Sequence, residues 1–114
     1  MEQKRKNLYD YSLGSSEQEI KEILLGHAQV RIERIISSGQ TSEWYDQEED
    51  EWVALLQGQA ILSYEGNQKD CLSPGDVVFI PAHKKHKVSA TSVTPPCVWL
   101  CVFMGNDEVD KCSS

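Results

Sequence analysis

Residues 52–64 read WVALLQGQAILSY, two apolar runs rich in β-branched and aromatic residues that meet at Gly58. Runs of this length, separated by a glycine, are typical of two short β-strands joined by a turn. Similar runs lie on both sides, and the strands that we expect in all are Gln29–Ser37, Trp52–Gln57, Gln59–Tyr64, Val77–Ile80, His86–Ala90 and Cys97–Phe103. Turn residues interrupt the chain at Gly39, Gly58, 65–67, 73–75 and 94–96. Six or more short strands with this spacing predict an all-β sandwich or barrel.

One segment before these strands has a different pattern. Ser16 and Glu19 have the spacing of a helix capping box, and the apolar residues Ile20, Ile23 and Leu24 recur at helical spacing. A glycine at position 26 can end a helix. We therefore expect one short amphipathic α-helix over about residues 16–25, ahead of the β-structure.

Length and composition limit the kind of protein. The chain has 114 residues, which is close to the size of one domain, so we expect a single domain over 1–114. Its 39% apolar and 25% charged residues are those of an ordinary globular protein. A net charge of -7 makes binding to nucleic acid or to an anionic membrane surface unfavourable, so neither partner is expected.

The location that we expect is the cytoplasm. The first residues carry charges without the apolar run that a signal peptide needs, and nowhere do eighteen apolar residues follow one another. In a chain that is not exported, cysteines are most simply reduced thiols. The four cysteines, Cys71, Cys97, Cys101 and Cys112, contain no Cys-x-x-Cys pair, and we interpret Cys97 and Cys101 as core residues.

Two segments carry the residues with chemical potential. In the first, Gly39, Tyr45, Gln47, Glu51 and Gly58 have the spacing of G-x5-H-x-H-x3-E-x6-G, with Tyr45 and Gln47 at the two histidine positions. This spacing resembles the first signature motif of the cupin superfamily. The substitution of both histidines removes two imidazoles from the pattern.

The second segment resembles the other cupin motif, G-x5-P-x-G-x2-H-x3-N. Gly75, Pro81 and His86 match it, whereas His83 stands at the glycine position and Ala90 at the asparagine position. The two motifs occupy residues 39–58 and 75–90, and their sequences are most similar to those of a subgroup of small single-domain cupins. The resemblance implies a double-stranded β-helix barrel, often a homodimer, with metal and substrate bound inside. It does not fix a reaction, because cupins include dioxygenases, isomerases, epimerases, lyases and sugar binders.

The resemblance also implies a candidate metal site. In metal cupins the motif histidines and the glutamate bind one divalent ion, so Gln47, Glu51 and His86 would form a three-ligand site for zinc, iron, manganese or nickel. Positions 45, 47 and 51 have one parity, so an extended chain turns them to the same face. Tyr45 would be a fourth ligand or part of the wall, and His83 a reserve ligand. If the protein is a catalyst, Tyr45 or His83 would carry protons.

Other interpretations of the same residues stay open. Glu51 and His86 can form a buried, mutually neutralising pair in a barrel without metal. The neighbouring acidic residues Glu48 and Glu49 are best explained as a solvated turn. The protein is therefore either a metal-dependent isomerase or dioxygenase acting on a small polar metabolite, or a metal-free module that binds such a metabolite without catalysis. A third alternative is an interaction protein with a vestigial pocket, and the sequence does not establish whether the protein is an enzyme.

Overall fold

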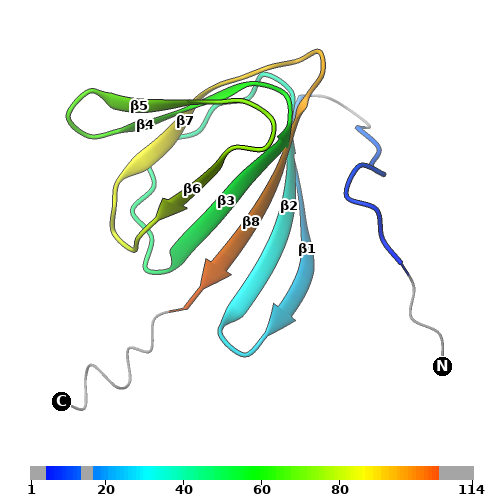
Figure 1. Ribbon diagram of the computed structural model, residues 1–114, viewed down its shortest axis with the longest axis horizontal. Coiled ribbons are helices and arrows are strands. Elements are labelled where there is room, and N and C mark those ends of the chain that lie inside the picture. The colour runs from blue at the N-terminus through cyan, green and yellow to red at the C-terminus, as the bar shows by residue number, and fades with distance from the viewer. Residues whose placement is uncertain (1–4, 14–16, 106–114) are drawn as a thin grey trace.

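The computed structural model describes residues 5–13 and 17–105, which form eight β-strands (Figure 1). The strands are β1 (Ile20–His27), β2 (Val30–Ser37), β3 (Asp50–Gln57), β4 (Ala60–Tyr64), β5 (Gln68–Leu72), β6 (Val77–Ile80), β7 (His86–Thr91) and β8 (Cys97–Met104). These described residues contain no helix, and so none that is long and apolar enough to cross a membrane.

The strands form two antiparallel sheets. The larger sheet has the order β1-β2-β8-β3-β6 and the smaller one the order β5-β4-β7 (Figure 1). Each sheet contains strands that are far apart in the sequence, since β2 pairs with β8 and β4 pairs with β7. The all-β prediction is confirmed, and this arrangement of two sheets is that of a double-stranded β-helix.

The core lies between the two sheets and follows the alternation of each strand. On β8, residues 97, 99, 101 and 103 are all buried, because every second side chain points to the same face. Trp99 donates a hydrogen bond from Nε1 to the Oγ atom of Ser37, 3.2 Å away. This bond gives the buried indole N–H a partner, and a buried donor without one would destabilise the fold. Leu62 and Leu72 complete the core from the smaller sheet. The interpretation of Cys97 and Cys101 as core residues is confirmed.

The predicted N-terminal helix is wrong. Residues 20–27 form β1, which pairs with residues 30–36 of β2, and only Ala28 and Gln29 lie between the two strands. Ala28 in this hairpin turn has a positive φ of 53°, a conformation that Asn or Gly usually adopts. The sequence therefore lacks the Asn-Gly signal that would have predicted the turn. Pairing with β2 outweighs the local helical pattern. Ser16, the expected cap, lies outside the described residues.

Strand β5 was not predicted either. Its sequence, Gln68 to Leu72, is mostly polar, and its side chains are exposed up to the buried Leu72. The turn that precedes it was predicted correctly, with Gly66 and Asn67 both at positive φ. The strand forms because the hairpin places it beside β4, not because its own composition favours β-structure.

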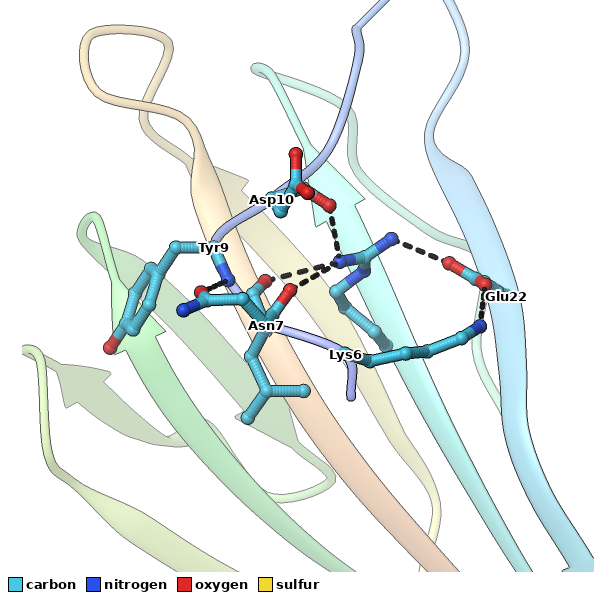
Figure 2. A network of polar contacts seen from close by, with 7 residues as sticks. Lys6, Asn7, Tyr9, Asp10 and Glu22 are labelled. Carbon is cyan, nitrogen blue, oxygen red and sulfur yellow. Dashed lines mark hydrogen bonds and ion pairs between the residues drawn. The ribbon is translucent and has the colours of Figure 1, made fainter. Parts of the chain in front are cut away.

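The chain before β1 packs against the outer face of the larger sheet. Arg34 on β2 donates hydrogen bonds to the backbone carbonyls of Asn7, Leu8 and Asp10, and forms an ion pair with Glu22 on β1. Figure 2 shows the labelled residues Lys6, Asn7, Tyr9, Asp10 and Glu22 of this network. Arg34 alternates with the inward-facing residues of β2, so this network lies on the side opposite the core.

Gly58 joins β3 to β4 at a place where only glycine fits. Its φ is +91°, and a Cβ atom there would lie 2.8 Å from Oγ of Ser92 and 2.9 Å from both Cα and Sγ of Cys97. Gly66 has a similar φ of +85°, but nothing lies within 4 Å of its virtual Cβ. The two glycines therefore share a left-handed backbone conformation, but only Gly58 has neighbouring atoms that a Cβ atom would contact.

We predict that Gly58→Ala destabilises the protein more than Gly66→Ala, the matched control. Gly66→Ala should cost about 1–2 kcal/mol for the left-handed conformation alone. Gly58→Ala should cost about 1–3 kcal/mol more, because backbone atoms of β8 must move. Urea unfolding of the two variants measures the difference, and equal losses would show that the contact with Cys97 is unimportant.

Candidate functional site

A cavity of about 210 Å³ lies between the two sheets, lined by inward-facing side chains of β1, β2, β3, β6, β7, β8 and β4 and by the segment before β3. Its polar lining residues are Glu19, Lys21, Arg31, Glu33, Ser37, Ser42, Tyr45, Gln47, Glu49, Glu51, His86 and Cys101. Its walls are otherwise apolar, with Val53, Leu62 and Phe103 among them. Four of the five predicted site residues line this cavity.

Glu51 is buried in the lining, with 8% of its surface exposed. Glu51 and Val53 lie two residues apart on β3, so both side chains point into the barrel. Gln47 donates a hydrogen bond from Nε2 to Oε1 of Glu51 at 3.1 Å. Burial is the largest influence on the Glu51 carboxyl and raises its pKa, whereas the Gln47 hydrogen bond and nearby His86 act in the opposite direction.

His86 faces Glu51 from the smaller sheet, at the first residue of β7, and is 3% exposed. The Nδ1 atom of His86 lies 2.9 Å from the backbone carbonyl oxygen of Lys84. A carbonyl only accepts, so Nδ1 carries a proton and donates it, and in the neutral ring Nε2 has the free lone pair. Nε2 lies 3.7 Å from Oε1 of Glu51. The imidazole thus presents its basic nitrogen to the carboxyl group.

Tyr45 is tied to His86 through the backbone. The amide N–H of Tyr45 donates to the carbonyl of His86 at 2.7 Å, and the amide of His86 donates to the carbonyl of Tyr45 at 3.1 Å. Their ring centroids are 5.5 Å apart. Tyr45, Gln47 and Glu51 all line the cavity, together with Val53.

The structure does not bring His83 to the cavity. Its side chain is 62% exposed, and its Nδ1 atom lies 2.8 Å from Oδ1 of Asp46. Its φ is +67° in the turn after Pro81, which directs the side chain outwards. Its amide N–H donates to the carbonyl of Gln47 at 2.8 Å, so the backbone of His83 supports the segment that carries Gln47. The sequence suggested His83 as a proton carrier, but its side chain lies outside the barrel, and this position does not support that role.

A cluster of charged residues that the sequence analysis missed lines the cavity as well. Arg31 donates to Oε2 and Oε1 of Glu49 at 2.8 and 3.0 Å, and to Oε2 of Glu33 at 2.6 Å. Its guanidinium carbon also lies 4.4 Å from the centroid of the Phe103 ring. Glu49 is therefore an ion-pair partner in the cavity lining, and its interpretation as part of a solvated turn is wrong. The sequence did contain a signal for this cluster: Arg31 and Glu33 lie two residues apart on a predicted strand, which places both side chains on the same face.

Cys101 lies beside Glu51 in the buried lining. Burial, more than any neighbouring charge, raises the pKa of its thiol, and Glu51 adds to the shift. The side chain therefore stays a neutral thiol. Of the cysteines in the described residues, Cys71, Cys97 and Cys101 are free, as expected for reduced thiols, whereas Cys112 lies outside those residues.

Two of the three predicted metal ligands are strong donors, and the third is a weaker one. Within residues 5–13 and 17–105, no group of three or more His, Cys, Asp or Glu side chains could hold a metal ion. Glu51 and His86 supply two strong donors, and an amide can present oxygen instead of nitrogen by rotation, so Gln47 can supply the third. An amide oxygen is a weaker ligand than the imidazole in the cupin motif, so an ion held by these residues would be bound less tightly than by the full motif.

Comparisons with known proteins agree with this fold. The Cupin domain family matches residues 32–103. A solved structure from Ralstonia eutropha JMP134, named "putative mannose-6-phosphate isomerase", is 39% identical, with a TM-score of 0.83, 91% of this chain covered and 100% of that chain. A cupin superfamily protein from Desulfitobacterium hafniense DCB-2 is 23% identical, with a TM-score of 0.77 and coverage of 93% and 95%.

KdgF from Halomonas sp. is 22% identical, with a TM-score of 0.66 and coverage of 80% of this chain and 84% of that chain. The two structures with lower identity show the shared fold alone. Among curated proteins, none matches the chain. The match over residues 32–103 includes both signature motifs up to the last strand, and the chain therefore belongs to the cupin family.

Proposed function

We propose that this cupin binds a small polar molecule in its cavity, beside a divalent metal ion held by Gln47, Glu51 and His86. The observation that carries the proposal is the buried pair of Glu51 and His86, whose Oε1 and Nε2 atoms face each other at 3.7 Å. This separation is longer than a hydrogen bond. It is close to the ~3.4 Å expected between a nitrogen and an oxygen that share one tetrahedral zinc ion.

The second support is the orientation of the ligands. The Lys84 carbonyl fixes the proton of His86 on Nδ1, an arrangement that is common for metal-binding histidines because it aims the other nitrogen at the ion. Gln47 already contacts the carboxyl group of Glu51, so its amide lies at the same point. Zinc, iron, manganese and nickel all accept such a set of nitrogen and oxygen donors.

The chemistry of the site depends on both the ion and the chain. A bound divalent ion supplies Lewis acidity, which polarises an oxygen of a coordinated molecule. Tyr45 forms part of the cavity wall next to His86, and its phenol is the proton carrier that the geometry favours. Val53 and Leu62 give this end of the cavity an apolar wall.

Lewis-acid isomerisation and dioxygenation are both compatible with these residues. The similarity to the Ralstonia protein, whose name is that of an isomerase, favours isomerisation as the reaction to test first. A homodimer and a cytoplasmic location remain predictions from the sequence.

A second function, metal-free binding of a small metabolite, is favoured by one observation. The Gln47 amide already donates to Glu51, so the carboxyl group has a partner without an ion. Burial also raises the pKa of Glu51, and a protonated carboxyl group is tolerated in an apolar cavity. In this alternative the polar groups orient a metabolite by hydrogen bonds alone.

Metal titration distinguishes the two functions. We expect the protein, purified without a chelating tag and treated with a chelator, to bind zinc or manganese at one site per chain in calorimetry. His86→Ala should weaken binding by more than about tenfold, because it removes a strong donor. His83→Ala, the matched control outside the cavity, should change it less than about twofold. Absence of metal binding, or equal losses in both variants, would overturn the metal-binding function.

The raised pKa of Glu51 predicts a pH dependence of stability when metal is removed. A folded-state pKa above the ordinary value of 4.5 means that the folded protein binds this proton more tightly than the unfolded chain. The stabilisation is complete below pH 4.5 and is lost as pH rises through the folded-state pKa.

Glu51→Gln should therefore remove part of the decline in the free energy of unfolding above pH 4.5. Glu43→Gln, the same change at an exposed position, should leave the decline unchanged. Urea unfolding in chelator from pH 4.5 to pH 8 measures both. Parallel curves for the Glu51 variant and the unchanged protein would contradict the assigned shift.

A further inference from the structure

The charged groups in the cavity lining are arranged so that no cation is free. Among the described residues that line it, four carboxylate side chains, Glu19, Glu33, Glu49 and Glu51, accompany two permanently cationic ones, Lys21 and Arg31. The carboxylates therefore outnumber the cations. A ligand that carries its own negative charge meets an excess of like charge in this lining.

Arg31 is already occupied by other groups of the protein. Two of its nitrogens donate to both oxygens of Glu49, its Nε donates to Glu33, and its face lies over the ring of Phe103. A phosphate is recognised best by a guanidinium with its donor edge available. Binding a phosphate here would first require Arg31 to break a bidentate ion pair.

Lys21 is not a free cation either. Its Nζ atom lies 3.8 Å from Oε1 of Glu19, and about half of its side chain is exposed at the outer part of the cavity. A lysine in this position contributes little to the selection of an anion, because solvent screens it and a carboxylate faces it.

A divalent ion would not change this conclusion. Held by Gln47, Glu51 and His86, it would add two positive charges to a lining in which four carboxylates face two cations. The charges of the lining would then sum to zero, which leaves no excess of positive charge to neutralise a phosphate dianion. With or without an ion, the lining has no excess of positive charge that would hold an anionic group.

We propose, on the basis of the function above, that the cavity takes a neutral polyhydroxylated molecule, such as a free sugar or sugar alcohol, and discriminates against its phosphorylated form. The observation behind the proposal is the closed ion-pair cluster of Arg31 with Glu33 and Glu49. Carboxylate oxygens that already accept from Arg31 keep further lone pairs, which can accept hydrogen bonds from the hydroxyl groups of a polyol. Phe103 and Val53 provide apolar surface for its C–H faces.

The size of the cavity agrees with a ligand of this class. Its volume of about 210 Å³ is smaller than the ~300–1,000 Å³ of pockets that hold drug-sized ligands. A small polyol or a single sugar ring is the appropriate scale for this cavity.

Calorimetry with matched pairs of ligands tests the inference. The probes are mannose and mannose 6-phosphate, glucose and glucose 6-phosphate, and the sugar alcohol erythritol, each measured with zinc and in chelator. We expect at least one neutral probe to bind, and its phosphorylated partner to bind about tenfold more weakly or not at all.

A charge variant links any preference to the cluster. Glu49→Gln removes one negative charge beside Arg31 and one of its two oxygen acceptors there, so it should improve the binding of the phosphorylated sugar relative to the neutral one by about threefold or more. Glu43→Gln changes the net charge equally at an exposed position outside the cavity lining, and it should leave the preference unchanged. Circular dichroism confirms that both variants are folded.

Two results would overturn the inference. One is binding of a phosphorylated probe as tightly as its neutral partner, which would leave the proposed function intact. The other is the absence of binding by every neutral probe. The metal titration with His86→Ala does not depend on any sugar, so it separates a failure of this inference from a failure of the metal-binding function.

Discussion

The site depends on the burial of one carboxyl group opposite one imidazole. Glu51 comes from β3 of the larger sheet and His86 from β7 of the smaller sheet, so the pair exists only when the two sheets face each other. Burial of a carboxylate is costly without partners, and Gln47 together with His86 supplies them. The two sheets therefore position these groups at the inner end of one cavity, beside the apolar side chains of Val53 and Leu62.

The cavity combines this buried pair with a more exposed cluster of charges. Glu51 and His86 are nearly inaccessible, whereas Arg31 and Glu49 are about one-third exposed at their side chains. Charges near solvent are screened, while buried ones interact strongly. In the proposed function, the inner part would hold the ion, and the outer part would act on the charge of the ligand.

The spacing of the two motifs was the most informative feature of the sequence. It identified Gln47, Glu51 and His86 as neighbours, and the structure brings all three to one cavity. The spacing could not show that His83 points outwards, because the direction of that side chain depends on a left-handed residue in a turn. The ion pairs of Arg31 were also hidden, since they join β2 to the segment before β3 across a large distance in sequence.

The amino-acid sequence by itself determined the β-class, most strand positions and the set of polar residues that can bind a ligand. These properties follow from local alternation, from glycines at turns and from motif spacing, which neighbouring residues express without tertiary contacts. The tertiary structure alone decided that residues 20–27 form a strand, that Glu49 pairs with Arg31 and that His83 lies outside the barrel. Each of these outcomes depends on a distant partner or on one backbone angle, and local sequence patterns do not encode either.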